Sequence, residues 1–225
     1  MAFTSYDAAL HGIGRAQQLL KGASLSGRRA LITPSGKRAF RRGTLSGSTI
    51  ADMRRLSVVM AIAALDTYMH RLIVERAFKH DTLPNGLAHL DIGFEDLLRQ
   101  ADETAAAARA NPYKPRPRVA VKRQLRDRLL RETFQNSDAV ARALSMAGRP
   151  KAWPAISEKM QASPAEVKER LNGIVTRRNQ IVHEGDYERR ERPQTPRRNP
   201  ITLSQARRDI DFIAELIDAI HAVVS

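Results

Sequence analysis

The sequence contains no cysteine, few aromatic residues and a shortage of acidic side chains. Without cysteine the chain can form no disulfide, no thiolate nucleophile and no thiolate zinc site. Aromatic residues such as Tyr113 are scarce near the basic stretches, so recognition of a partner by base stacking is expected to be limited. The 38 Lys and Arg outnumber the 24 Asp and Glu, giving a net charge of +14. An excess of this size favours a polyanionic partner such as nucleic acid.

Targeting signals and long apolar runs are also missing. The N-terminal stretch MAFTSYDAALHG has no basic start followed by an apolar segment, so no signal peptide is expected. The longest apolar run, around Val58 to Leu65, is too short to cross a bilayer. These absences predict a cytoplasmic protein that has no membrane partner.

Apolar residues recur at helical spacing through most of the sequence, and no strand pattern competes with them. The sequence therefore predicts an all-α fold, a helical bundle in which residues 1–225 form a single domain. Three stretches rich in basic residues, glycine or proline interrupt the helices. They are a basic loop or hairpin at 21–48, a basic connector at 111–120 and a charged loop at 184–200. Helices are expected at about 6–20, 48–80, 94–110, 121–134 and 136–147, and from 163 and 203 onward.

The longest predicted helix, at about 48–80, carries a wide apolar stripe and is expected to form the centre of the core. The stripe consists of Ile50, Met53, Leu56, Met60, Ala63, Ala64 and Leu72. The clearest helix start is Ser163-Pro164-Ala165-Glu166, a capping box with proline at the first helical position. Trp153 and Pro154 are expected in the connection before it, and Val182 on its apolar face.

The run Arg178-Asn179-Gln180-Ile181-Val182-His183, near the end of that helix, has the richest chemical content in the chain. Arginine supplies a permanent, forked cation that suits phosphate. Histidine is the side chain that most readily takes and gives a proton near neutral pH. Five residues of ideal helix would place Arg178 and His183 about 140° apart. Either the helix ends between them, which Gly185 favours, or two copies of the helix meet to form a joint site.

The stretch RRNQIVHEGD, at 177–186, resembles the Arg-x4–6-His motif of the HEPN superfamily, all-helical proteins that include many metal-independent endoribonucleases. The earlier stretch MAIAALDTYMHRLI, at 60–73, resembles the long second helix of the RiboL-PSP-HEPN branch. The resemblance implies a helical-bundle core, a homodimer with a composite cleft, and RNA cleavage linked to toxin or anti-phage defence. It places Arg178, Asn179 and His183 at the motif positions.

The resemblance suggests a mechanism in which the RNA 2′-hydroxyl attacks its neighbouring phosphorus. His183 transfers a proton as general base or acid, Arg178 neutralises charge on the phosphoryl oxygens, and Asn179 orients a neighbouring group. No metal or cofactor is predicted. An antitoxin or sensor protein is a possible partner. Toxins silenced by a partner nucleotidyltransferase have a tyrosine two residues after the histidine, whereas Tyr187 lies four residues after His183. Regulation by tyrosine modification is therefore not expected.

Several residues outside the motif are candidates for supporting roles. Asp66, on the central helix, either holds Arg178 or His183 in place or pairs with His70 four residues on, the structural alternative being favoured. The leading surface for RNA lies on the basic helix at 121–134, and the alternative is that its basic residues form only a solvated helix face. The loop arginines at 28, 29, 38, 41 and 42 form a second candidate. The residues predicted to bind RNA are Lys122, Arg123, Arg126, Arg131 and Arg177.

Two other functions fit the same sequence. The first is a non-catalytic HEPN-like module that binds RNA or nucleotides, or only dimerises, through the same residues. The second is a helical DNA-binding regulator that uses the basic helix at 121–134. No helix-turn-helix pattern with a short glycine turn is present there, which lowers the second alternative.

Overall fold

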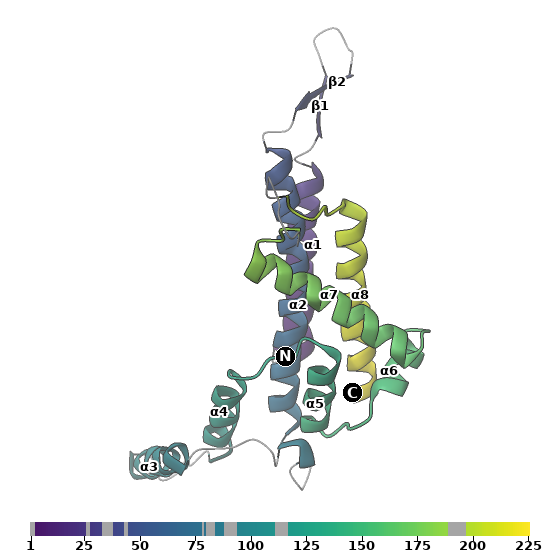
Figure 1. The fold of residues 1–225 in the computed structure, drawn as a ribbon. Coiled ribbons are helices and arrows are strands. Elements are labelled where there is room, and N and C mark those ends of the chain that lie inside the picture. Colours follow the sequence, from purple (N-terminus) through teal and green to yellow (C-terminus); the bar gives the residue numbers. More distant parts are fainter. Residues whose placement is uncertain are drawn as a thin grey trace.

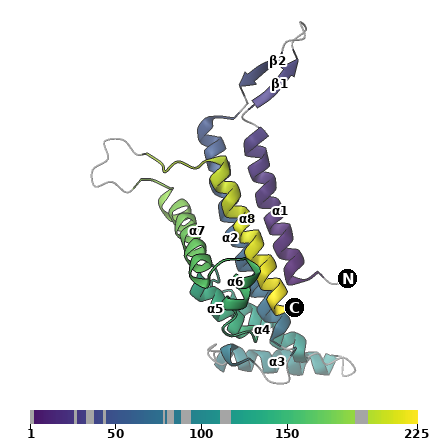
Figure 2. The same cartoon turned by 90° about the vertical axis from the view of Figure 1, so that its right-hand side faces the viewer.

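A 30-residue helix, α2 (Gly47–Arg76), runs through the centre of the computed structural model and organises the rest of the chain (Figure 1). The structure describes residues 3–25, 28–32, 38–42, 45–77, 79, 84–87, 94–110, 117–188 and 197–225. Helices α1 (Ser5–Leu25) and α8 (Leu203–Val224) lie alongside α2, and α7 (Pro164–Glu184) crosses it (Figures 1 and 2). The other helices are α3 (Phe94–Ala110), α4 (Pro117–Leu129), α5 (Ser137–Met146) and α6 (Trp153–Lys159), with a 3-10 turn at Asn85–Leu87.

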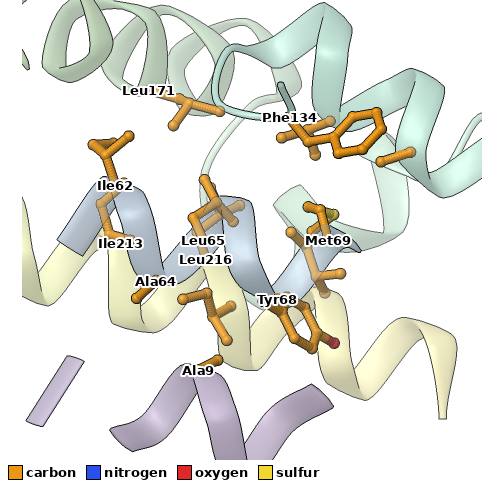
Figure 3. Close-up of a cluster of buried hydrophobic side chains, with 14 of the residues drawn as sticks. Ala9, Ile62, Ala64, Leu65, Tyr68, Met69, Phe134, Leu171, Ile213 and Leu216 are labelled. Atoms are coloured by element: carbon orange, nitrogen blue, oxygen red, sulfur yellow. The ribbon is translucent and has the colours of Figure 1, made fainter. Parts of the chain in front are cut away.

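The core lies where α2 meets α1, α7 and α8 (Figure 3). Leu65 of α2 is fully buried, as are Leu171 of α7 and Leu216 of α8. Small residues let α1 approach α2 closely, because a Cβ at Gly12 would meet the Cβ of Ala64 at only 2.7 Å. The all-α bundle predicted from the sequence is therefore confirmed, and its core is built from helix-to-helix packing of alanine and branched apolar side chains.

The buried face of α2 differs from the predicted stripe. Leu56 is 51 % exposed and Ala63 is exposed, whereas Val58, Ile62 and Tyr68 are fully buried. Nearly every residue from Leu56 to Leu65 is apolar, so the sequence pattern alone does not fix which side faces inward. The same correction applies to Val182 of α7, which was expected on the apolar face and is 47 % exposed.

By length and composition α2 is apolar enough to cross a membrane, contrary to the expectation that no segment is. However, 61 % of its most apolar window is buried inside the bundle. A central core helix passes the same test as a membrane span, and burial against α1 and α8 accounts for the apolar character of α2.

The interruptions between helices hold more structure than the sequence predicted. Strands β1 (Arg28–Ile32) and β2 (Arg38–Arg42) form an antiparallel hairpin within the segment expected to be a loop or hairpin, although no strand pattern was recognised. The segment itself is shorter than predicted, because α1 continues to Leu25. Residues 117–120, expected in an extended connector, form the first turn of α4, which begins at proline, and 111–116 lie outside the described residues. Trp153 and Pro154 open helix α6 instead of lying in a connection.

Candidate functional site

Helix α7 has well-defined ends, which fix the position of every residue in the Arg178–His183 run. At its start the Ser163 side chain accepts from the backbone N–H of Glu166, and the Glu166 carboxylate accepts from that of Ser163, as the sequence predicted. At its end Gly185 adopts a left-handed conformation, with φ of 62°, and its N–H donates to the carbonyl of Gln180. The helix therefore continues without a break through His183 to Glu184.

Arg178 and Asn179 are in direct contact. The Nη1 group of Arg178 donates to Oδ1 of Asn179 over 3.0 Å, and the Arg178 side chain is half-buried. Its Nε is buried and has no hydrogen-bond partner among the described residues. Asn179 thus gives one side of the guanidinium a hydrogen-bond partner.

His183 lies in the last turn of α7 and is exposed, as is Asn179 one turn before it. Because the helix is intact from Arg178 to His183, the two side chains leave it about 140° apart around its axis. The first of the two arrangements considered, in which the helix ends between them, is therefore contradicted.

Directly after α7, Asp186 is fully buried and binds two arginines from different helices. Its Oδ2 accepts from Nε of Arg55 on α2 at 2.5 Å and from Nη2 of Arg177 on α7 at 2.9 Å. Asp186 has a positive φ of 63°, a conformation that aspartate tolerates better than most residues. Burying a charge is costly unless it is paired and hydrogen-bonded, and the two guanidiniums provide that pairing.

The chain returning to α8 completes this cluster. The backbone N–H and the side-chain amide of Asn199 both donate to the Asp186 carbonyl, at 2.8 and 3.2 Å. Nη2 of Arg55 donates to the carbonyl of Asn199 at 2.7 Å. Asp52 accepts from both Arg55 and Arg198. We call Asp52, Arg55, Arg177, Asp186, Arg198 and Asn199 the polar clamp.

The polar clamp fixes the C-terminal turn of α7, and hence the backbone around His183, to the first third of α2. The sequence predicts that Arg177 binds RNA, but the structure places this side chain in the polar clamp. Its Nη2 donates to Asp186 and to the carbonyls of Asn199 and Pro200. Sequence reasoning missed Arg55 and Asp186. Arg55 lies three residues before Val58 and seven before Ile62 and shares their buried face, but the sequence alone does not show that this face is buried.

Asp66 is remote from Arg178 and His183 and contacts neither. Its Oδ1 accepts from the backbone N–H of Phe134 at 2.6 Å, and its Oδ2 from the Gln135 amide. Eleven residues separate Asp66 from Arg55, about 16 Å along α2. The supporting role predicted for Asp66 is therefore wrong. Its Oδ1 lies 3.8 Å from Nδ1 of His70, so the structural alternative is the better account: Asp66 holds the chain after α4 against α2.

The basic residues of α4 do not join the Arg178–His183 run within one chain. Arg123 and Arg126 of α4 are exposed and Lys122 is half-buried. Arg131 is exposed in the turn after α4, because the helix ends at Leu129 and not at 134 as predicted. α4 packs on α2 through His70, whose Nε2 lies 2.9 Å from the carbonyl of Leu129. His70 lies fifteen residues, or about 22 Å of helix, beyond Arg55 on α2. Among the described residues there is no group of three or more His, Asp and Glu side chains placed to hold a metal ion.

Comparison with known protein families supplies the class of this fold. The RiboL-PSP-HEPN family matches residues 35–225, which is most of the chain and includes α2, α7 and α8. The chain therefore belongs to the RiboL-PSP-HEPN family and contains a HEPN domain. Comparison with curated proteins and with solved structures gave no match.

Proposed function

We propose that this chain is a metal-independent endoribonuclease that acts as a homodimer. The observation that carries the proposal is the arrangement on α7: Asn179 holds the Arg178 guanidinium, and His183 stands exposed one turn beyond Asn179. Membership of a HEPN family supports it, because ribonucleases are common among such domains. A role as a toxin or anti-phage effector, with an antitoxin or sensor partner, belongs to the same proposal.

The reaction uses the 2′-hydroxyl of RNA as nucleophile. Its oxygen forms a bond to the adjacent phosphorus while the bond from phosphorus to the 5′-oxygen of the next nucleotide breaks. One histidine removes the 2′-proton and a histidine gives a proton to the leaving 5′-oxygen. Arg178 stabilises the charge that grows on the non-bridging oxygens. The products are a 2′,3′-cyclic phosphate and a 5′-hydroxyl.

A second copy of α7 supplies what one copy lacks. Since Arg178 and His183 diverge by about 140° on one helix, a single copy does not aim both at one phosphate. Two helices related by a two-fold axis place a pair of arginines and a pair of histidines around one groove.

The test is an assay of purified protein with total RNA and with a defined transfer RNA, in EDTA. Wild type is expected to cut and to leave cyclic-phosphate ends, and His183→Ala to lose this activity. His11→Ala is the matched control, because His11 is also an exposed helical histidine and lies on α1. An all-deoxy strand of the same sequence should survive, since it lacks the nucleophile.

Three results would sink the proposal: a requirement for a divalent metal, cleavage of the all-deoxy strand, or equal activity in His183→Ala and wild type. Binding of RNA without cleavage would instead favour the non-catalytic HEPN-like module. In that case Arg178→Ala should lose RNA affinity. Equal binding of DNA and RNA duplexes would favour the DNA-binding regulator.

A further inference from the structure

The first quarter of this chain contains a long basic segment that has no acidic residue. Residues 8–51 contain eight Lys or Arg and no Asp or Glu, so this segment supplies more than half of the net +14. The β1–β2 hairpin lies within it and carries five of these eight residues in its strands, namely Arg28, Arg29, Arg38, Arg41 and Arg42. No carboxylate in the segment is available to neutralise them.

The register of the hairpin sets like charges opposite each other. Arg28 pairs with Arg42, and the next position along pairs Arg29 with Arg41. Like charges directly opposite destabilise a strand pair, and a two-stranded hairpin is only marginally stable in water to begin with. Because successive strand positions alternate between faces, one arginine pair belongs to each face of the ribbon. A ligand that brings negative charge to both faces would remove this repulsion.

The hairpin projects beyond the bundle, from the ends of α1 and α2 (Figures 1 and 2). Each strand has five residues, an extension of about 17 Å. It stands at the same end of α2 as the polar clamp, since Arg55 is only eight residues, or about 12 Å, from the start of α2 at Gly47. One extended polyanion can therefore reach both the hairpin and the C-terminal turn of α7.

We propose that the β1–β2 hairpin is an arm that holds folded RNA through its phosphates while α7 acts on the same molecule. The choice of RNA rests on the function proposed above. Guanidinium groups bind phosphate through paired hydrogen bonds, and arginine pairs on both faces suit a ribbon lying between two phosphate backbones. The arm recognises backbone and shape, because its strands offer a single aromatic residue, Phe40, for stacking.

The test compares two quadruple variants that each remove four positive charges. The arm variant carries Arg28→Thr, Arg29→Thr, Arg41→Thr and Arg42→Thr, since threonine favours strands. The control carries Arg142→Gln, Arg149→Gln, Lys159→Gln and Arg207→Gln, all at exposed positions elsewhere on the surface. Both are made in a His183→Ala background, which prevents cleavage. Binding of labelled transfer RNA is measured by fluorescence anisotropy over a range of salt concentrations.

The arm variant is expected to bind at least about tenfold more weakly than its parent, with the slope of log affinity against log salt reduced by about three. The control is expected to lose much less in both quantities. In the parent, RNA should also slow amide hydrogen exchange in the hairpin strands. Equal losses in the two variants would overturn the arm, because net charge alone would then explain binding. Equal affinity of the protein for an all-deoxy strand of the same sequence as the transfer RNA would overturn the choice of RNA.

Different experimental results would contradict the proposed arm and the proposed ribonuclease activity. A protein that binds RNA through the hairpin but never cuts it contradicts the ribonuclease and keeps the arm. A protein that cuts RNA, but binds it equally well with and without the arm arginines, contradicts the arm and keeps the ribonuclease. With His183 intact, the arm variant should show a raised KM and an unchanged kcat, since the arm does not touch the reacting phosphate.

Discussion

Helix α2 is buried by two opposite means along its length. In its middle and C-terminal half, Leu65, Met69 and Ile73 are buried against other apolar side chains. Near its start Arg55 is just as inaccessible, at 6 % exposure, yet it is surrounded by Asp186, Asp52 and the Asn199 carbonyl. The apolar part tolerates changes that keep volume, whereas the polar part depends on the buried charges keeping their counter-charges. The α7 turn that carries His183 is thus attached to the bundle by the less tolerant means.

Removing the carboxylate at the centre of the polar clamp should have the largest effect on stability. Asp186→Asn keeps a residue that tolerates positive φ but leaves Arg55 buried without its main counter-charge. We expect a loss of about 3–5 kcal/mol in the free energy of unfolding. Urea denaturation followed by circular dichroism measures it. Asp52→Asn is the control and should cost less than about 1 kcal/mol, because that side chain is 44 % exposed. Equal losses would mean that Asp186 is not the centre of the clamp.

Truncating the apolar part of the same helix should cost somewhat less. Leu65→Ala removes a fully buried side chain and leaves a cavity between α2, α7 and α8, at a cost of about 2–5 kcal/mol. Leu56→Ala, at a position 51 % exposed, should change stability by no more than about 0.5 kcal/mol. The same denaturation experiment compares them. A larger effect at Leu56 would restore the stripe predicted from the sequence and contradict the observed burial.

The N-terminal cap of α7 tests the end of that helix opposite the polar clamp. Ser163→Ala removes the side chain that accepts from Glu166 and should destabilise the protein by about 1 kcal/mol. Ser163→Asp keeps an acceptor and should recover most of the loss. Thermal unfolding of the two variants gives the comparison. Because this cap is far along α7 from His183, neither change should alter the proposed RNA cleavage, and a change in kcat would show that the clamp alone does not hold the turn.

The smallest effect is a dependence on pH at Asp209 of α8. Burial raises the pKa of this carboxyl, although Arg170, Arg208 and Arg177 lower it. A raised pKa means that the folded protein holds the proton more tightly than the unfolded chain. The associated stability is present at low pH and is lost as pH rises from about 4 through the folded pKa. Asparagine has no such proton to lose, so the stability of Asp209→Asn relative to wild type should increase as pH rises through the same range. A difference that stays constant with pH would contradict this.

Local signals in the sequence predicted much of this fold. Capping residues such as Ser163, the glycine after Glu184 and the apolar spacing of α8 each depend on residues within one or two turns, so short stretches of sequence suffice. The hairpin was missed as strands because its positions do not alternate between apolar and polar residues.

The candidate site was only partly predictable, for a physical reason. Arg178, Asn179 and His183 share one helix, and their spacing is visible in the sequence. The contact between Arg55 and Asp186 joins residues 131 positions apart, and only the folded chain brings them together. Asp66 was chosen for its charge near the middle of the central helix, but the chain that packs beside it there is the segment after α4.

Tyr187 and Arg198 form an isolated antiparallel β-bridge, and this pairing has a practical consequence. It fixes the two ends of the intervening segment at neighbouring positions, with Glu188 N–H donating to the Arg197 carbonyl at 2.7 Å. Lengthening a connection whose ends are already joined costs little, since doubling its length adds only about 0.6 kcal/mol of closure entropy. A fluorescent reporter or an affinity peptide inserted between these ends should leave the bundle intact.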